Sequence, residues 1–304
     1  MLERTETCWI DRESGNAAHS HIELHARIPN GVTSIGHYAF SGCGSIKSIT
    51  IPDSVTSIGE NAFVNCGNLK SATIGNGVTS IGARAFEACS SLKSIVIPDN
   101  VARLAACTFY DCSSLKSVML GANIESIGEY AFYRCASLKD ITIPDSVTSI
   151  GDNAFAYCKS LSSINIPDSV VSIGRFAFAR CDKLASAKLS NNVTRIERVA
   201  FLDCVSLTDI DIPDSVTSIG ADAFSGCISL TRVTIPNSVT SIDWGAFSGC
   251  RNLTSVTIPN SVMSMGEVVF FHCCSLKSIR VPKHFDAETV KRWDLPDTCE
   301  IIWY

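Results

Sequence analysis

The sequence has no long apolar run and little of the chemistry that enzymes use. Its longest apolar stretches are a few residues, whereas a membrane-spanning helix needs about 20. It contains no phosphate-binding glycine loop, no paired-carboxylate site and no zinc-type CxxC pair. Its net charge of -5 gives it no general attraction for nucleic acid or anionic membranes. We therefore expect no enzymatic activity, cofactor, metal, nucleic-acid partner or membrane insertion.

The first residues, MLERTETCWIDRESGN, also lack the apolar stretch of a secretory signal. We expect a cytoplasmic protein, or a cell-surface or secreted one if a leader was removed.

One pattern dominates what is present. A phenylalanine recurs with a constant 23-residue period along most of the chain, and each one is followed by a cysteine at the third position after it. The phenylalanines are Phe40, Phe63, Phe86, Phe109, Phe132, Phe155, Phe178, Phe201, Phe224, Phe247 and Phe270, and the cysteines are Cys43, Cys66, Cys89, Cys112, Cys135, Cys158, Cys181, Cys204, Cys227, Cys250 and Cys273. A fixed period of this length predicts stacked identical coils in which each coil buries the same side chains.

The recurring cysteines are interpreted as a column of packed free thiols. Parallel side chains that point into one core do not present the dihedral angle of a disulfide, although adjacent coils lie only about 5 Å apart. Packed thiols behave as small hydrophobic groups. A reducing compartment would keep them in that form.

The repeat unit, IPDSVTSIGxxAFxxCxSLxxIx, divides into three pieces. The spacing of apolar residues in Gly59–Leu69 predicts a short helix or 3-10 turn. The alternating LxxIxI element predicts a strand with one buried face, which a proline ends in most coils. VTSIG then returns its valine and isoleucine to the core, and its glycine supplies either a positive φ or a close backbone approach.

The repeat also predicts the organisation of the chain. Residues 28–282 form about eleven repeats, 1–27 form an N-terminal cap that uses Trp9, Ile10, Ile22 and Leu24, and 283–304 form a C-terminal cap. In that cap Trp293 stands where the next phenylalanine would be, with Ile302 and Tyr304 at the two buried strand positions.

Units such as IPDSVTSIGDNAFAYCKSLSSI at 143–164 closely resemble the BspA-type leucine-rich repeats. The resemblance implies an α/β repeat solenoid, coiled right-handed, with a concave parallel β-sheet and short helical or 3-10 turns on the other side. That family includes bacterial and protist surface proteins that adhere to host or matrix proteins. Membership would imply a non-enzymatic protein-interaction module, with a cell-surface adhesin as the alternative.

Solenoids bind through their extended strand face, so the informative residues are outward strand positions that depart from serine and threonine. These departures concentrate in the middle coils, and we predict a partner-binding surface there on a monomer. Its residues are Lys93, Val96, Lys116, Met119, Lys139, Asp140, Asn165, Lys188, Asp209, Asp211 and Arg232. Neutral drift on a solvated face is the competing interpretation.

Three of these residues belong to a lysine stripe, Lys47, Lys70, Lys93, Lys116 and Lys139, one position after the leucine of each coil. Lysines stacked about 5 Å apart repel one another, and an anionic partner would relieve that repulsion. Splaying of the side chains into solvent would relieve it equally.

The sequence also contains three weaker patterns. His19, His21 and His25 have a spacing compatible with a metal site, but a solvated terminal segment explains them as well. Cys274, next to His272, is a candidate reactive thiol without a third orienting group. Threonine ladders, including Thr56, Thr79 and Thr217, leave ice binding as a remote alternative.

Overall fold

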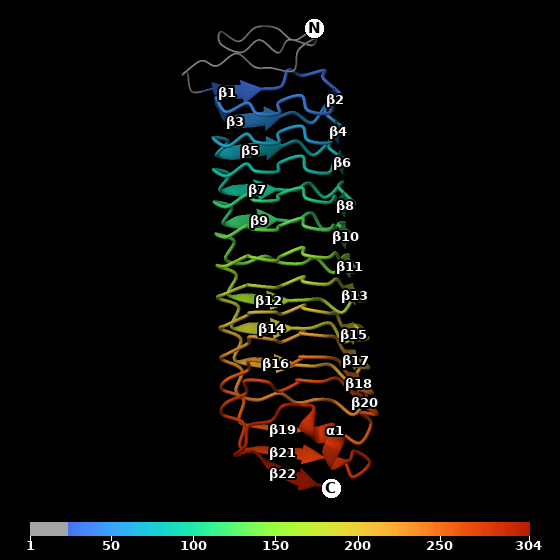
Figure 1. The fold of residues 1–304 in the computed structure, drawn as a ribbon. Coiled ribbons are helices and arrows are strands. Elements are labelled where there is room, and N and C mark those ends of the chain that lie inside the picture. The colour runs from blue at the N-terminus through green and yellow to red at the C-terminus, as the bar shows by residue number, and fades with distance from the viewer. Residues whose placement is uncertain (1–23) are drawn as a thin grey trace. The chain divides into compact units, whose positions relative to one another are not determined.

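The computed structural model describes residues 24–304 and divides the chain into two compact units, one ending at Val147 and the other comprising Thr148–Tyr304. Within each unit the chain winds as a parallel β-solenoid. Longer strands stack along one side of the coils and two-residue strands stack along another (Figure 1). Trp9, Ile10, Ile22, His19 and His21, singled out above, lie outside the described residues.

The longer strands come from the predicted LxxIxI element. In unit 1 they form one sheet of β1 (Leu24–Arg27), β3 (Ile46–Ile51), β5 (Ser71–Ile74), β7 (Ser94–Val96) and β9 (Ser117–Met119). In unit 2 they form two sheets, one of β12 (Ser163–Asn165), β14 (Ser186–Lys188) and β16 (Asp209–Asp211), the other of β19 (Ser255–Thr257), β21 (Ser278–Val281) and β22 (Glu300–Trp303). Every pairing is parallel.

The two-residue strands come from VTSIG, where the sequence predicted inward side chains but no strand. Unit 1 contains β2 (Ser34–Ile35), β4 (Ser57–Ile58), β6 (Ser80–Ile81), β8 (Arg103–Leu104) and β10 (Ser126–Ile127). Unit 2 contains β11 (Ser149–Ile150), β13 (Ser172–Ile173), β15 (Arg195–Ile196), β17 (Ser218–Ile219), β18 (Ser241–Ile242) and β20 (Ser264–Met265).

The core is the predicted stack of phenylalanines and cysteines. Neighbouring phenylalanine rings lie 5.0–5.6 Å apart by centroid in unit 1 and 5.4–6.0 Å apart in unit 2, nearly parallel to one another. The repeat cysteines are all buried as thiols rather than joined in disulfides, as predicted. Burial raises the pKa of Cys66 and of Cys204 from 9.0 to about 12, because the thiolate would lose its hydration.

The segment around each phenylalanine corrects the prediction of a helix or 3-10 turn. In Gly59–Leu69 the chain forms successive turns, with Asn61 and Asn65 in the left-handed region at φ 55 and 61. Left-handed residues interrupt a right-handed helix. The N–H groups of Asn61, Phe63 and Asn65 instead donate to carbonyls of the next coil at 2.8–3.0 Å, so the turns also join neighbouring coils.

The glycine that ends VTSIG in most coils permits a close approach, although Ala105, Glu197 and Asp243 stand at the same position in three coils. Gly59 does not have a positive φ, but a Cβ there would lie 2.6 Å from the backbone nitrogen of His37 in the preceding coil. Of the positive φ and the close backbone approach predicted for this glycine, Gly59 therefore shows the close approach.

The C-terminal segment contains α1 (Ala287–Lys291), the one α-helix among residues 24–304. Trp293 after it is fully buried. Strand β22 places Ile301 and Trp303 in register with the buried Ile279 and Val281. The assignment of Ile302 and Tyr304 to those positions was wrong by one residue, because the segment with α1 does not keep the 23-residue spacing.

Candidate functional site

In unit 1 the structure brings the predicted apolar residues together. Val96 on β7 and Met119 on β9 are direct partners in the strand register, and their side chains are 55% and 66% exposed. The residues between the outward positions, such as Ile95 and Val118, are buried. The strand alternation that buries the core therefore also holds this apolar pair in solvent.

The lysine stripe runs beside that pair. The backbone N–H of Lys93 donates to the carbonyl of Lys70 at 3.2 Å, and that of Lys116 donates to the carbonyl of Lys93 at 2.8 Å, so successive lysines are stacked coil on coil. Lys93 and Lys116 are exposed, and neither has an acidic partner within 4.0 Å in the described part of the chain. Lys139 continues the stripe, with Asp140 next to it, and both are exposed.

In unit 2 the predicted residues form a polar surface. Asn165, Lys188 and Asp211 occupy the same register position on β12, β14 and β16, and all three are exposed. Asp209 lies two residues before Asp211 on the same outward face. The arrangement places a positive side chain between an amide and a carboxylate.

One contact in this surface was missed from the sequence. The Arg232 guanidinium pairs with the Asp209 carboxylate at 3.3 Å, and both side chains remain mostly exposed. The two residues are 23 positions apart, so the period itself placed them side by side. An exposed pair of this kind contributes about 0–1 kcal/mol, and it partly neutralises the charge that Asp209 offers a partner.

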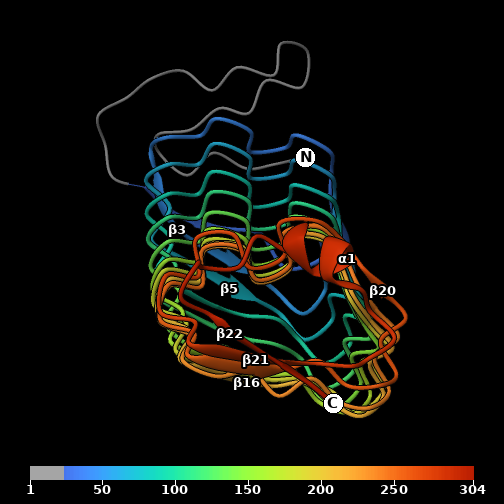
Figure 2. The same cartoon turned by 60° about the horizontal axis from the view of Figure 1, so that its bottom comes forward.

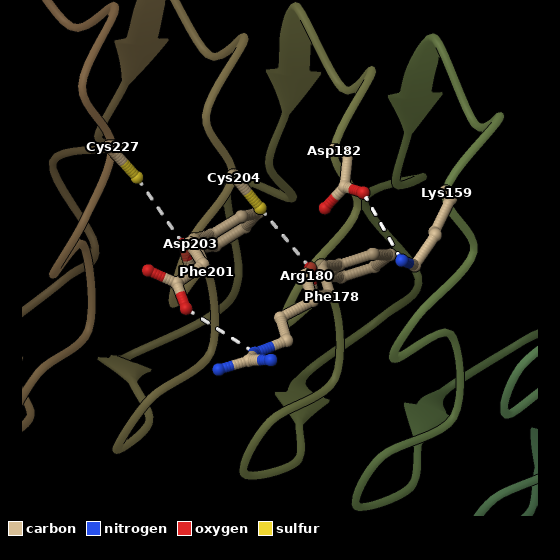
Figure 3. Close-up of polar contacts among 8 residues, drawn as sticks. All are labelled: Lys159, Phe178, Arg180, Asp182, Phe201, Asp203, Cys204 and Cys227. Atoms are coloured by element: carbon tan, nitrogen blue, oxygen red, sulfur yellow. Dashed lines mark hydrogen bonds and ion pairs between the residues drawn. The ribbon is translucent and has the colours of Figure 1, made fainter.

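The turn side of unit 2 carries further pairs of the same type that sequence reasoning did not find. Lys159 pairs with Asp182 at 3.7 Å and Arg180 with Asp203 at 3.3 Å, each across one coil (Figure 3). Opposite charges one repeat period apart are the signal that identifies them.

The candidate reactive thiol contacts a backbone carbonyl and not the His272 ring in the described part of the chain. The Cys274 sulfur is exposed and contacts the backbone carbonyl of His272 at 3.5 Å, while the His272 ring packs on Phe271 with centroids 3.7 Å apart. No cluster of metal-ligating side chains occurs within residues 24–304. His25, the one described member of the histidine group, contacts the Ser48 hydroxyl at 2.6 Å.

Four hydroxyls of the threonine ladders already donate within the chain. The hydroxyls of Thr56, Thr79, Thr217 and Thr240 each donate to a backbone carbonyl of the preceding coil at 3.1 Å. A surface that orders ice needs regularly spaced groups free to bond outward, and these hydroxyl hydrogens already have acceptors within the chain.

Comparison with known families agrees with the repeat. The model of the BspA type leucine rich repeat region matches residues 18–135, 103–231 and 194–291, which together span most of the sequence. This chain belongs to the BspA-type leucine-rich repeat family. Among the curated proteins none matches the sequence. In the described residues no helix is long and apolar enough to cross a membrane.

Solved structures of bacterial repeat proteins share the fold. A leucine-rich repeat protein from Bacteroides ovatus is 27% identical with a TM-score of 0.63, and the match covers 98% of each chain. A leucine rich cell surface protein from Faecalibacterium prausnitzii is 28% identical with a TM-score of 0.58, covering 99% of this chain and 95% of that one. The pneumococcal vaccine antigen PcpA, at 21% identity and a TM-score of 0.51, matches 93% of this chain and 76% of its own.

Proposed function

We propose that this BspA-type protein is a non-enzymatic protein-interaction module that binds its partner on the outward strand face of unit 1. The observation that carries the proposal is the exposed pair Val96 and Met119 beside Lys93 and Lys116. Apolar side chains held in solvent next to unpaired charges are typical of an interface in which an apolar anchor is surrounded by charge pairs.

The chemistry of this face favours a partner with an apolar side chain next to acidic groups. Val96 and Met119 supply the apolar contact, and methionine adapts its shape to different partners. Lys93, Lys116 and Lys139 attract carboxylates, sulfates or phosphates, so association weakens as salt screens the charges. The polar surface of unit 2, from Asn165 to Arg232, is proposed as a second region that selects among partners by charge.

The test is a pull-down with the intact chain, followed by affinity measurement for each captured protein. Met119→Ser and the double change Lys93→Glu with Lys116→Glu are each expected to weaken the specific partner at least about tenfold, which corresponds to about 1.4 kcal/mol. Binding should also fall with added salt.

Lys183→Glu provides the matched control, because Lys183 is an exposed lysine in unit 2 outside the proposed surfaces. It reverses one lysine charge, as each of the two changes in the double variant does, and should leave affinity unchanged. If Met119→Ser and the lysine reversals behave like Lys183→Glu, the unit 1 face is not the binding surface.

A second candidate function is adhesion at the cell surface. It is favoured by the description of the similar Faecalibacterium prausnitzii chain as a cell surface protein. Labelling of intact cells with a membrane-impermeant reagent distinguishes the two. Labelled protein supports adhesion, and protection from the reagent until lysis supports an internal scaffold.

A further inference from the structure

Strand β22 leaves apolar core positions uncovered at the outer end of unit 2. Ile301 and Trp303 are in register with Ile279 and Val281, which are fully buried, yet they remain 39% and 38% exposed. Ile302 between them is 37% exposed. Figures 1 and 2 place β22 at the end of the coils, and Figure 2 shows that α1 lies on another part of the last coil and not over the strand.

The outer edge of β22 also carries free backbone groups. The N–H of Glu300 donates to Lys277 at 2.8 Å and that of Tyr304 to Val281 at 3.1 Å, so these residues direct their backbone groups toward β21. Backbone direction alternates along a strand, so Ile301 and Trp303 direct theirs outward. Within residues 24–304, β22 has β21 as its one sheet neighbour.

The strand is held firmly in this position. The Tyr304 hydroxyl donates to the carbonyl of Ile258 at 2.7 Å, and the Arg280 guanidinium lies over the Tyr304 ring at 5.0 Å from its centroid. An ordered, apolar, unpaired edge is a template for another strand.

We propose that β22 pairs with β22 of a second copy of this chain, antiparallel, about a two-fold axis through Ile302. In this register Ile301 of one copy faces Trp303 of the other, and the pair exchanges both N–H···O=C bonds. The symmetry repeats the pair on the other side of the axis. The side chains of Ile301 and Trp303 then lie on the core side in both copies and cover each other.

Charge supports a second copy as the occupant. The two-fold register places Glu300 of one copy opposite Tyr304 of the other. Tyr304 carries Arg280 over its ring, and its carbonyl accepts the N–H of Lys283 at 3.1 Å. Each copy therefore brings the Glu300 carboxylate toward the residue whose ring carries its partner's Arg280 guanidinium, and the edge is complementary to itself. This dimer departs from the monomer expected from the sequence.

The test measures the mass of the full chain by sedimentation across a dilution series. We expect a reversible shift from 32.6 kDa to twice that mass. Ile301→Pro removes an outward N–H that β21 does not use, and proline favours the extended backbone that Glu300 already has. It should raise the dimer dissociation constant about tenfold or more while leaving the melting temperature of the monomer unchanged.

A charge exchange tests the two-fold register itself. Glu300→Lys should weaken the dimer, and adding Lys283→Glu to it should recover part of the lost affinity. Val171→Ser, which removes an exposed apolar side chain elsewhere in unit 2, should have no effect. A single mass of 32.6 kDa at every concentration, growth beyond a dimer, or further weakening by Lys283→Glu would each overturn the proposal.

Discussion

Most repeat cysteines fill the core and also donate a hydrogen bond to a phenylalanine carbonyl of the preceding coil. The Phe40 carbonyl accepts the backbone N–H of Cys43 at 3.1 Å and the thiol of Cys66 at 3.0 Å. The Phe178 carbonyl accepts the Cys204 thiol at 3.2 Å (Figure 3). Alanine would leave a cavity at this position and lose the second bond. The thiol therefore recurs for packing and for a weak hydrogen bond, without any requirement for reactivity.

Backbone strain is a second property of single residues in this fold. Val268 has φ 49 and Asn153 has φ 56, at equivalent positions two residues before a core phenylalanine. A β-branched side chain is disfavoured in the left-handed region, whereas asparagine tolerates it. We expect Val268→Asn to stabilise unit 2 by about 1 kcal/mol and Asn153→Val to destabilise it by a similar amount.

Urea unfolding of the two variants measures this effect. Both side chains are half-buried, so the reciprocal substitutions control for changes in burial. Changes of the same sign in the two variants would show that burial, and not φ, decides stability at these positions.

Among the elements, most of the longer strands were predictable, whereas the two-residue strands and the turns were not. The alternation of Leu92, Ile95 and Ile97 predicts a half-buried strand, and β7 forms there. The same alternation in Leu138, Ile141 and Ile143 was wrong as a strand prediction, because residues 138–144 form no strand although these three side chains are buried. The spacing of Ala62, Phe63 and Cys66 suits a helix and successive turns equally, because both place residues three apart on one side. The left-handed residues that decide between them include Asn61, Arg84 and Val199, which share no side-chain type.

The candidate surface was likewise predicted only in part from the sequence. The period identified Val96 and Met119 as outward neighbours, because positions one period apart must adjoin. It did not show that Arg232 uses its charge on Asp209, since pairing depends on the rotamers of two long or flexible side chains. Register is encoded in the repeat, whereas side-chain contacts on the exposed face are not.

Several coils approach one another closely at the glycine that ends VTSIG. A Cβ at Gly82 would lie 2.5 Å from the backbone nitrogen of Glu60, whereas a Cβ at Gly36 would have no atom of residues 24–304 within 4 Å. We expect Gly82→Ala to lower the free energy of unfolding by about 1–3 kcal/mol, because backbone atoms must move apart. Gly36→Ala is the matched control and should have little effect in the same urea titration. Equal effects would contradict the close-approach explanation.

For the whole molecule, the column of buried thiols makes the free energy of unfolding fall as pH rises into the alkaline range. Burial raises the pKa of Cys66, Cys204 and Cys273 from 9.0 to about 12, so the folded state holds protons that the unfolded state releases. The stabilisation is complete below pH 9 and is lost as pH rises toward 12. One pH unit above the unfolded pKa, each such thiol costs about 1.4 kcal/mol.

Urea midpoints at pH 8 and pH 10 test this dependence. The midpoint should fall markedly at pH 10, and in Cys204→Ala the fall should be smaller by about 1.4 kcal/mol of unfolding free energy. If the unfolding free energy fell equally in Cys204→Ala and in the unchanged chain, the loss of stability at pH 10 would come from groups other than the Cys204 thiol.

The constant register has one more consequence. Ser163, Ser186 and Asp209 are aligned one period apart, so each coil meets the next through the same backbone bonds. A deletion or duplication of one whole period in the gene would join matching halves of two coils and leave the surrounding core contacts in phase. A lineage with this architecture can therefore change its number of coils by unequal recombination, and with it the length of surface available for binding, without first redesigning its interior.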